Sequence, residues 1–140
     1  MKSLVTLSHT DAQRALAAIQ GELEKRGRAA VITVVDSHGE LIALLRLDGT
    51  PLPSITIAAN KAWTAARERK PSKELGQAAR DAVTGFDMAY FGDGRYIGWG
   101  GGMPVSVDGQ VVGAIGVSGL PEAEDIELAQ MGVQAILSAL

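Results

Sequence analysis

The sequence predicts a single α+β domain over residues 1–140, in which helices pack on a mainly antiparallel sheet. Two pairs of short apolar runs, each joined by a turn that contains glycine, indicate two β-hairpins. Helical patterns precede, separate and follow these hairpins, without the strand–helix–strand alternation of a parallel sheet. A chain of 140 residues with 46% hydrophobic residues is large enough to bury one core.

The first helix and the first hairpin are predicted from their boundary residues. Apolar residues at helical spacing predict a helix over 9–26, with Ser8 as its N-cap and Gly27 as its left-handed end. A run rich in β-branched residues then predicts a strand over 29–35. Turn residues lead from this strand into a second strand over 41–47, which completes the hairpin.

Two helices are expected in the middle of the chain. An alanine-rich pattern predicts a helix over 54–69, which Ser54 can cap and Pro71 ends. Ser72 can cap a shorter helix that runs toward residue 81.

The last part of the chain predicts the second hairpin and a final helix. Apolar runs over 103–107 and 111–117 flank the Asp108-Gly109 pair, which is typical of a tight hairpin turn. A helix begins after Pro121, and the acidic residues of its first turn suit the positive end of its dipole.

Composition and charge exclude several classes of protein. The formal net charge of −3 and the pI near 5.3 argue against a nucleic-acid partner. The absence of cysteine excludes disulfides and thiolate chemistry. No apolar run approaches the length of a membrane span and no signal-peptide pattern occurs, so we expect a cytoplasmic protein without a membrane partner. His9 and His38 lack metal-ligand spacing, so no metal site is expected.

A glycine-rich segment over 98–104 is the first candidate for ligand contact. It contains Gly101, Gly102 and Pro104, and glycine allows the backbone to bend sharply or to approach a ligand closely. Free amides in such a segment can form an anion-binding concavity. The segment does not spell the dinucleotide fingerprint and precedes a strand, which excludes that class. The alternative interpretation is a tight structural entry into the following strand.

A second glycine-rich segment over 113–119 lies inside and after the last predicted strand. Glycines within a strand mark a bulge or the close approach of another group. Ser118 and Gly119 come just before the last helix, whose N-terminal amides suit a carboxylate. If the two glycine-rich segments lie at neighbouring ends of the sheet, they wall one pocket.

One cation and two aromatic side chains complete the candidate site. Lys61 interrupts the small-residue face of its helix and is a candidate to bind an anionic substrate or a haem propionate. The alternatives for Lys61 are exposure to solvent or a pair with an acid such as Asp48. Tyr96 and Trp99 flank the glycines and are candidates for an aromatic lining around a planar ligand, the alternative being core or interface packing.

Five motifs in one order carry a resemblance to a known family. They are Val34-Val35-Asp36-x-x-Gly39, Arg46-Leu47-Asp48-Gly49, Ile57-Ala58-x-x-Lys61-Ala62-x-Thr64-Ala65, Gly100-Gly101-Gly102-Met103-Pro104-Val105 and Gly113-Ala114-Ile115-Gly116-Val117-Ser118-Gly119. This series, followed by Asp125-x-x-x-Ala129, resembles the GlcG/HbpS-like family, which includes the C-terminal domain of PduO-type proteins. The resemblance extends from about residue 8 to the last residue.

The resemblance implies a profilin-like architecture, in which helices flank a five-stranded antiparallel sheet, and a homo-oligomer, either a dimer or larger. Members have been associated with haem, so the resemblance also implies haem as a cofactor. The site residues that match the motifs are Lys61, Gly101, Gly102, Pro104, Ser118 and Gly119. No axial haem ligand is carried over, because cysteine is absent and neither histidine lies in a shared motif.

Three functional hypotheses follow from these residues. The first is an oligomeric protein that binds haem or another anionic small molecule in the glycine-rich pocket. The alternative is an enzyme acting on a small carboxylate in a catabolic pathway, in which the amides of Gly101 and Gly102 stabilise an oxyanion and Lys61 binds the carboxylate. In that enzyme a tyrosine or an aspartate moves protons. The third is an accessory subunit whose exposed aromatic side chains serve only assembly.

Overall fold

A computed structural model describes residues 1–140 and contains four α-helices, four strands and one 3-10 helix. In chain order these are α1 (His9–Arg26), β1 (Val31–Asp36), β2 (Leu41–Arg46), α2 (Ser54–Glu68), α3 (Ser72–Ala79), η1 (Met88–Phe91), β3 (Gly102–Val107), β4 (Gln110–Ser118) and α4 (Glu122–Leu137). All predicted helices and strands are therefore present, with boundaries shifted by one or two residues. None of the helices is long and apolar enough to cross a membrane.

The four strands form one antiparallel sheet in the order β2-β1-β4-β3. Both predicted hairpins are confirmed, because β1 pairs with β2 and β3 pairs with β4. The expected fifth strand is wrong. The segment before α1 makes a backbone hydrogen bond from Leu7 to Val112 at 2.9 Å but forms no strand. The profilin-like detail therefore remains unconfirmed, while the α+β class holds.

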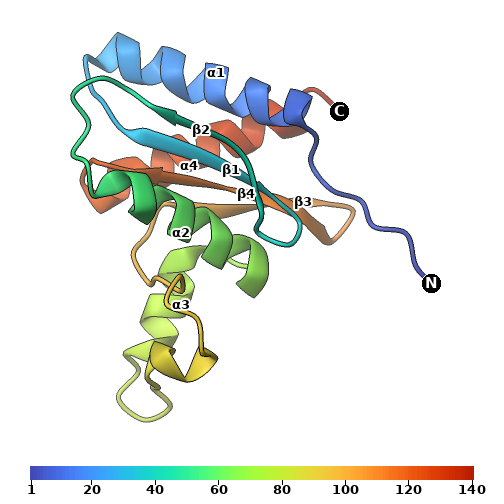
Figure 1. The fold of residues 1–140 in the computed structure, drawn as a ribbon, viewed down its shortest axis with the longest axis vertical. Helices are drawn as coiled ribbons and strands as arrows, with labels where there is room; N and C mark the ends of the chain where they lie inside the picture. Colours follow the sequence, from blue (N-terminus) through green and yellow to red (C-terminus); the bar gives the residue numbers. More distant parts are fainter.

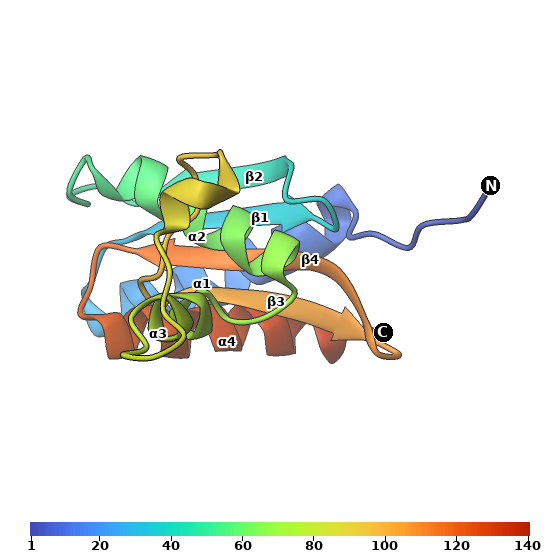
Figure 2. The same cartoon turned by 90° about the horizontal axis from the view of Figure 1, so that it is seen from below.

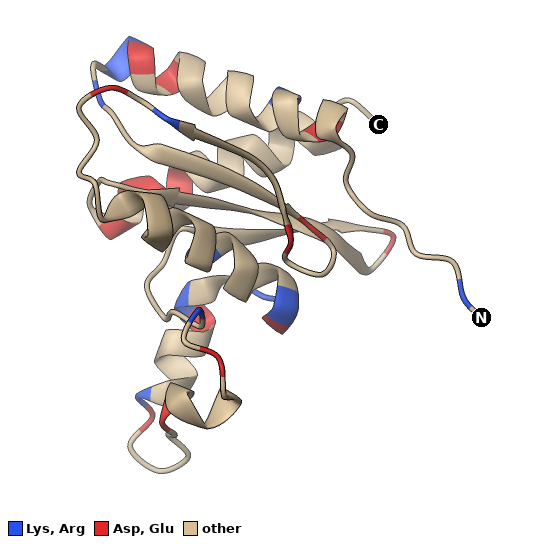
Figure 3. Ribbon diagram, in the orientation of Figure 1, with Lys and Arg blue, Asp and Glu red and all other residues tan.

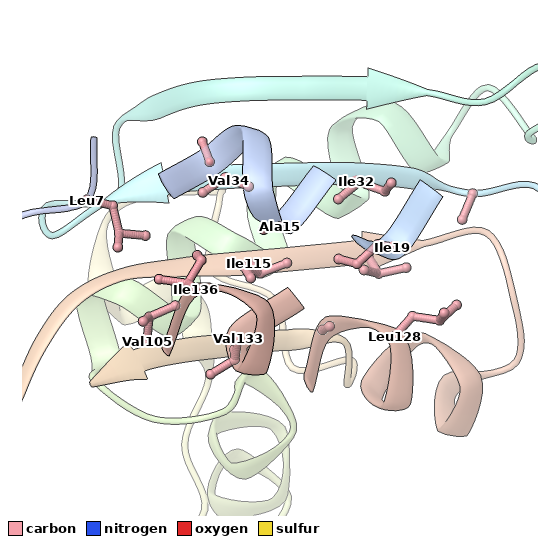
Figure 4. Packing of buried hydrophobic residues seen from close by; sticks show 14 of the residues in the cluster. Leu7, Ala15, Ile19, Ile32, Val34, Val105, Ile115, Leu128, Val133 and Ile136 are labelled. Carbon is pink, nitrogen blue, oxygen red and sulfur yellow. The ribbon is translucent and has the colours of Figure 1, made fainter. Parts of the chain in front are cut away.

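Helices cover both faces of the sheet (Figures 1 and 2). Helices α1 and α4 pack together on one face, and α2 crosses the other over β1, β4 and β3. The main apolar core lies between α1, α4 and the sheet, where side chains such as Ile19, Ile115 and Leu128 are fully buried (Figure 4). A smaller cluster of alanines and Val35 joins α2 to the opposite face.

The predicted cap of α1 is confirmed, and the two other serine caps are wrong. Ser8 and Asp11 form a reciprocal capping box, and Gly27 ends the helix in the left-handed conformation. The N-cap positions of α2 and α3 are prolines, so Ser54 and Ser72 fall on the first helical residue instead. Both serines are buried, and the hydroxyl of Ser72 bonds to another segment.

Helix α3 and the residues that follow it extend away from the sheet (Figure 1). We call residues 80–97 the projecting segment. Its aromatic rings contact one another at steep angles, with 5.7 Å between the ring centroids of Phe86 and Phe91 and 4.4 Å between those of Phe91 and Tyr96. Tyr96 then contacts Trp63 of α2 edge-on at 4.5 Å, which attaches the segment to the domain.

Two glycines allow α2 to lie close to the sheet. Gly102 and Gly116 are cross-strand partners in β3 and β4. A Cβ on Gly116 would overlap the carbonyl oxygen of Ala58 and lie 2.7 Å from the nitrogen of Ala62, and a Cβ on Gly102 would overlap the carbonyl oxygen of Lys61. The close approach predicted for glycines within the strand is thus an approach of helix backbone, and it fixes the depth of Lys61 above the sheet.

We predict that Gly116→Ala lowers the free energy of unfolding by about 1–3 kcal/mol, because the added methyl group forces α2 away from the sheet. Urea unfolding of the variant and the wild type measures this difference. Gly21→Ala is the matched control, since no atom lies within 4 Å of its added Cβ. It lies within α1, where alanine gains roughly 0.5–1 kcal/mol over glycine. Equal stability of both variants would contradict the packing argument.

Candidate functional site

A cavity of about 450 Å³ opens between the start of α2, the end of β4, the first turn of α4 and the loop before β3. Its volume lies within the range of small-molecule sites in proteins. Most of the lining is polar or glycine, and the residues are Pro51, Ser54, Lys61, Trp99, Gly100, Ser118, Gly119, Leu120, Glu122 and Asp125. Trp99 and Gly100 of the first glycine-rich segment and Ser118 and Gly119 of the second line this cavity.

A buried ion pair forms the inner wall of this cavity. The Nζ atom of Lys61 donates to Oδ2 of Asp125 at 3.0 Å and to the carbonyl oxygen of Val117 at 2.9 Å. Lys61 is only 3% exposed and Asp125 only 2% exposed. The second oxygen of Asp125, Oδ1, accepts the backbone N–H of Leu120 at 3.2 Å. One pair of side chains thereby joins α2, the end of β4 and α4.

Burial dominates the electrostatics of Asp125. Desolvation raises its pKa above the ordinary value, although the Lys61 ammonium and the N–H of Leu120 both act in the opposite direction. The neighbouring Glu124 carboxylate raises the pKa further. Glu124 belongs to the acidic first turn of α4, which is visible in Figure 3. The ionised form of Asp125 therefore depends strongly on the Lys61 ammonium.

The loop that carries Trp99 is held from both sides. Glu122 accepts the N–H of Gly100 at 2.8 Å and pairs with Lys73 of α3 at 3.2 Å. These two contacts lower the pKa of Glu122, the hydrogen bond from Gly100 most strongly. On the other side, Ser72 donates to the carbonyl oxygen of Trp99 at 2.7 Å and accepts the N–H of Gly102 at 2.9 Å. The rim of the cavity is consequently fixed to α3 and α4.

Two hydroxyls and one aromatic ring of the lining are free to contact a ligand. The hydroxyls of Ser54 and Ser118 make no hydrogen bond within the protein, although both residues are nearly buried. The indole of Trp99 is 59% exposed at the rim. The cavity therefore offers hydroxyl groups inside and one aromatic surface outside.

The structure brings together some of the predicted site residues and separates others. Lys61, Trp99, Ser118 and Gly119 line the cavity. Gly101 lies behind the ion pair, with a φ of +124°, and a Cβ there would come within 2.9 Å of Nζ of Lys61. Gly101 and Gly102 do not line the main cavity but a separate, smaller one of about 240 Å³.

The two other predicted residues lie elsewhere. Pro104 is in β3, paired with Ala114 of the sheet, and does not line the cavity. Tyr96 packs on Trp63 and Phe91 at the base of the projecting segment. Packing, the alternative interpretation of this tyrosine, is therefore what the structure describes.

Two acidic residues of the site were missed at the sequence level. Glu122 was interpreted through the helix dipole alone, Asp125 through the dipole and a family motif without a role in the site, and Asp48 was named as a partner for Lys61. A signal for Asp125 existed, because it shares a helical face with the buried Leu128 and Ala129. A charged residue on a buried face needs a partner of opposite charge, and Lys61 was the lysine that interrupted an apolar helix face.

Haem, the cofactor implied by the resemblance, needs an axial protein ligand for its iron. A haem iron takes histidine, cysteine, methionine or tyrosine as its axial protein ligand, and the cavity lining contains none of these. His9 and His38 are exposed, at the start of α1 and in the β1–β2 turn. No cluster of three histidine or acidic side chains is placed to hold a metal ion. The donors of this cavity do not fit iron ligation.

Comparison with known proteins identifies the family. Residues 7–134 match the family described as haem degrading protein HbpS-like. The chain is 38% identical over 118 residues to the protein GlcG of Escherichia coli K12, covering 84% of this chain and 85% of GlcG. This chain therefore belongs to the HbpS-like family.

Solved structures share the fold. The crystal structure of the protein ORFY of Klebsiella pneumoniae superposes with a TM-score of 0.93 at 31% identity, covering all of this chain and 96% of that one. The structure of a PduOC–haem complex superposes with a TM-score of 0.86 at 27% identity, covering 94% of this chain and 95% of that one.

We predict that Lys61→Met destabilises the fold by about 3–5 kcal/mol near neutral pH, because it leaves the Asp125 carboxylate buried without a counter-charge. The loss shrinks in acid. The pKa of Asp125 is raised in the folded chain, so ionising this carboxyl costs folding free energy. The folded chain therefore keeps its full stability at low pH, where Asp125 is protonated, and loses stability as the pH rises through the raised pKa. Urea unfolding at several pH values measures the effect.

Two variants control this prediction. The double variant Lys61→Met/Asp125→Asn removes both charges, so it should recover much of the lost stability and lose most of the pH dependence. Lys73→Met breaks an exposed ion pair and should cost less than about 1 kcal/mol. A double variant as unstable as Lys61→Met would show that packing of the lysine stem, rather than charge, determines the loss.

Proposed function

We propose that this chain is a small-molecule-binding protein whose ligand is haem or another anionic molecule, held in the cavity beside Lys61. The observation that carries the proposal is the set of unpartnered groups in one cavity. The hydroxyls of Ser54 and Ser118 have no protein partner, and Lys61 lines the same cavity. A concave site with a few convergent polar groups is the usual setting for a small-molecule ligand, and these donors suit a ligand that supplies acceptors.

The lining favours a small anionic molecule over haem. Trp99 and Leu120 are the large apolar side chains of the cavity, which is little apolar surface for a macrocycle. The support for haem comes from the family, since the PduOC structure was solved as a haem complex. If haem binds in this cavity, its propionates are the groups that match the lysine and the serines, while its iron finds no ligand among the lining residues.

We predict that benzoate, a flat monocarboxylate, binds at one site per chain and that Trp99→Ala weakens this binding about tenfold, since the indole supplies the aromatic surface at the rim. Isothermal titration calorimetry measures the affinity. Trp99 is more than half exposed, so its replacement leaves the core intact.

Tyr90→Ala is the matched control, because Tyr90 is another exposed aromatic, 89% accessible, on η1 of the projecting segment. Its benzoate affinity should equal that of the wild type.

We propose that the exposed side chains of this segment mediate self-association, so sedimentation should show a smaller assembly for Tyr90→Ala and an unchanged one for Trp99→Ala. Absence of saturable benzoate and haemin binding would refute the proposed function.

Haemin is tested in the same samples. Displacement of benzoate by haemin places the propionates of haem in this cavity. Haemin binding that leaves benzoate in place would assign haem to another surface and the cavity to the smaller ligand.

The second candidate function is an enzyme acting on a small carboxylate. The observation that favours it is Asp125, a buried carboxyl with a raised pKa at the wall of a cavity, which is a common property of groups that transfer protons. We predict that any turnover of a small carboxylic acid is reduced at least a hundredfold in Asp125→Asn. Assays of the purified chain across a panel of such acids measure it. Turnover unaffected by the substitution would eliminate Asp125 as the proton donor or acceptor.

A further inference from the structure

The cavity has one more donor beyond its two hydroxyls. A lysine ammonium carries three N–H groups, and Lys61 uses two of them within the protein, toward Val117 and Asp125. The third has no protein acceptor. Together with the hydroxyls of Ser54 and Ser118, it completes a set of donors that suits one carboxylate group.

A bound carboxylate would be the second negative charge beside a single buried ammonium. Asp125 already occupies one side of Lys61 at 3.0 Å, and both residues are almost fully buried. Two carboxylates that share one site cannot both remain ionised at low cost, and one of them retains a proton to a higher pH. The ion pair therefore constrains the form in which an acid can enter.

No other charged group near the cavity can neutralise the added charge. On α4, Glu122 is occupied by Gly100 and Lys73, and Glu124 pairs with Arg28 at 3.1 Å and with Arg26 at 3.8 Å. On α3, Lys73 is the cation of the Glu122 pair. Lys61 is thus the one cation of the cavity wall.

We propose that the cavity takes up a small monocarboxylate together with one proton, which Asp125 and the ligand carboxylate share. The inference deepens the proposed function and rests on it, because it assumes that the anionic ligand binds beside Lys61. The proton comes from solvent, no covalent bond forms or breaks, and the net charge of the site is the same before and after binding.

Two further observations agree with this assignment. Burial already raises the pKa of Asp125 in the free protein, and a second negative charge beside it acts in the same direction. Glu122 is not the acceptor, because the N–H of Gly100 and the Lys73 ammonium hold its pKa below the ordinary value. A dicarboxylate is disfavoured, since its second charge would find no free cation in the lining.

Calorimetry of benzoate binding in two buffers of different ionisation enthalpy measures the number of protons taken up. The titrations run above about pH 6, where free benzoate is ionised, since carboxyl groups have pKa values near 4. The expected result for the wild type is an uptake close to one proton and an affinity that falls about tenfold for each unit of pH. Benzamide, the neutral isostere, should bind without proton uptake.

Asp125→Asn should bind benzoate without proton uptake and with an affinity independent of pH. Glu122→Gln, which changes the other carboxyl of the lining, should keep the wild-type slope. Should Asp125→Asn fail to fold, the proton count and the benzamide comparison in the wild type still decide the question.

Each result has one interpretation. Benzoate binding without proton uptake in the wild type would overturn this inference and leave the proposed function intact. A pH slope that persists in Asp125→Asn would likewise overturn the assignment of the proton. No binding of benzoate or haemin at any pH would overturn both.

Discussion

The structure depends on a lysine and an aspartate that are buried together. Removing two charges from water is costly, and the cost is offset only where geometry and further hydrogen bonds are favourable. Here Lys61 also donates to the carbonyl oxygen of Val117 near the end of β4, and Asp125 also accepts the N–H of Leu120. The pair thus fixes the register between α2, α4 and the end of β4, which are the three elements that form the cavity.

Glycines allow this ion pair to lie close to the sheet. Gly102 and Gly116 place the backbone of α2 directly on the sheet, and Gly101 leaves the space beside the lysine ammonium empty. A side chain at any of the three would displace either the helix or the ion pair. These three glycines therefore act mainly by positioning the Lys61–Asp125 ion pair, rather than by contacting a ligand in the main cavity.

The elements of the fold could be predicted from the sequence because their signals are local. Ser8, Asp11 and Gly27 define α1, and Asp108-Gly109 defines the second hairpin. The fifth strand came from a family expectation that no local pattern in this chain supported. Ser54 and Ser72 were assigned as caps because serine favours that position, but preceding prolines and tertiary contacts placed them inside the helices.

The candidate site was only half predictable, because it depends on long-range contacts. Lys61, Trp99, Ser118 and Gly119 were found through residue type and neighbouring glycines. Asp125 is 64 residues away from its partner, and no local pattern joins the two. Pro104 was included because it matches a family motif, and Tyr96 because it flanks the glycines, yet strand pairing and aromatic packing direct them elsewhere.

The projecting segment has a consequence for how members of this family can diverge. In its first half, the N–H of Phe86 donates to the carbonyl oxygen of Ala79 at the end of α3. At its C-terminal end, the hydroxyl of Thr64 bonds to the backbone of Arg95 and Ile97. Everything between these two attachments lies outside the main core. Insertions and deletions are tolerated best in exposed chain of this kind. The length and the side chains of this segment can therefore change during evolution while the sheet and the lysine–aspartate contact are kept.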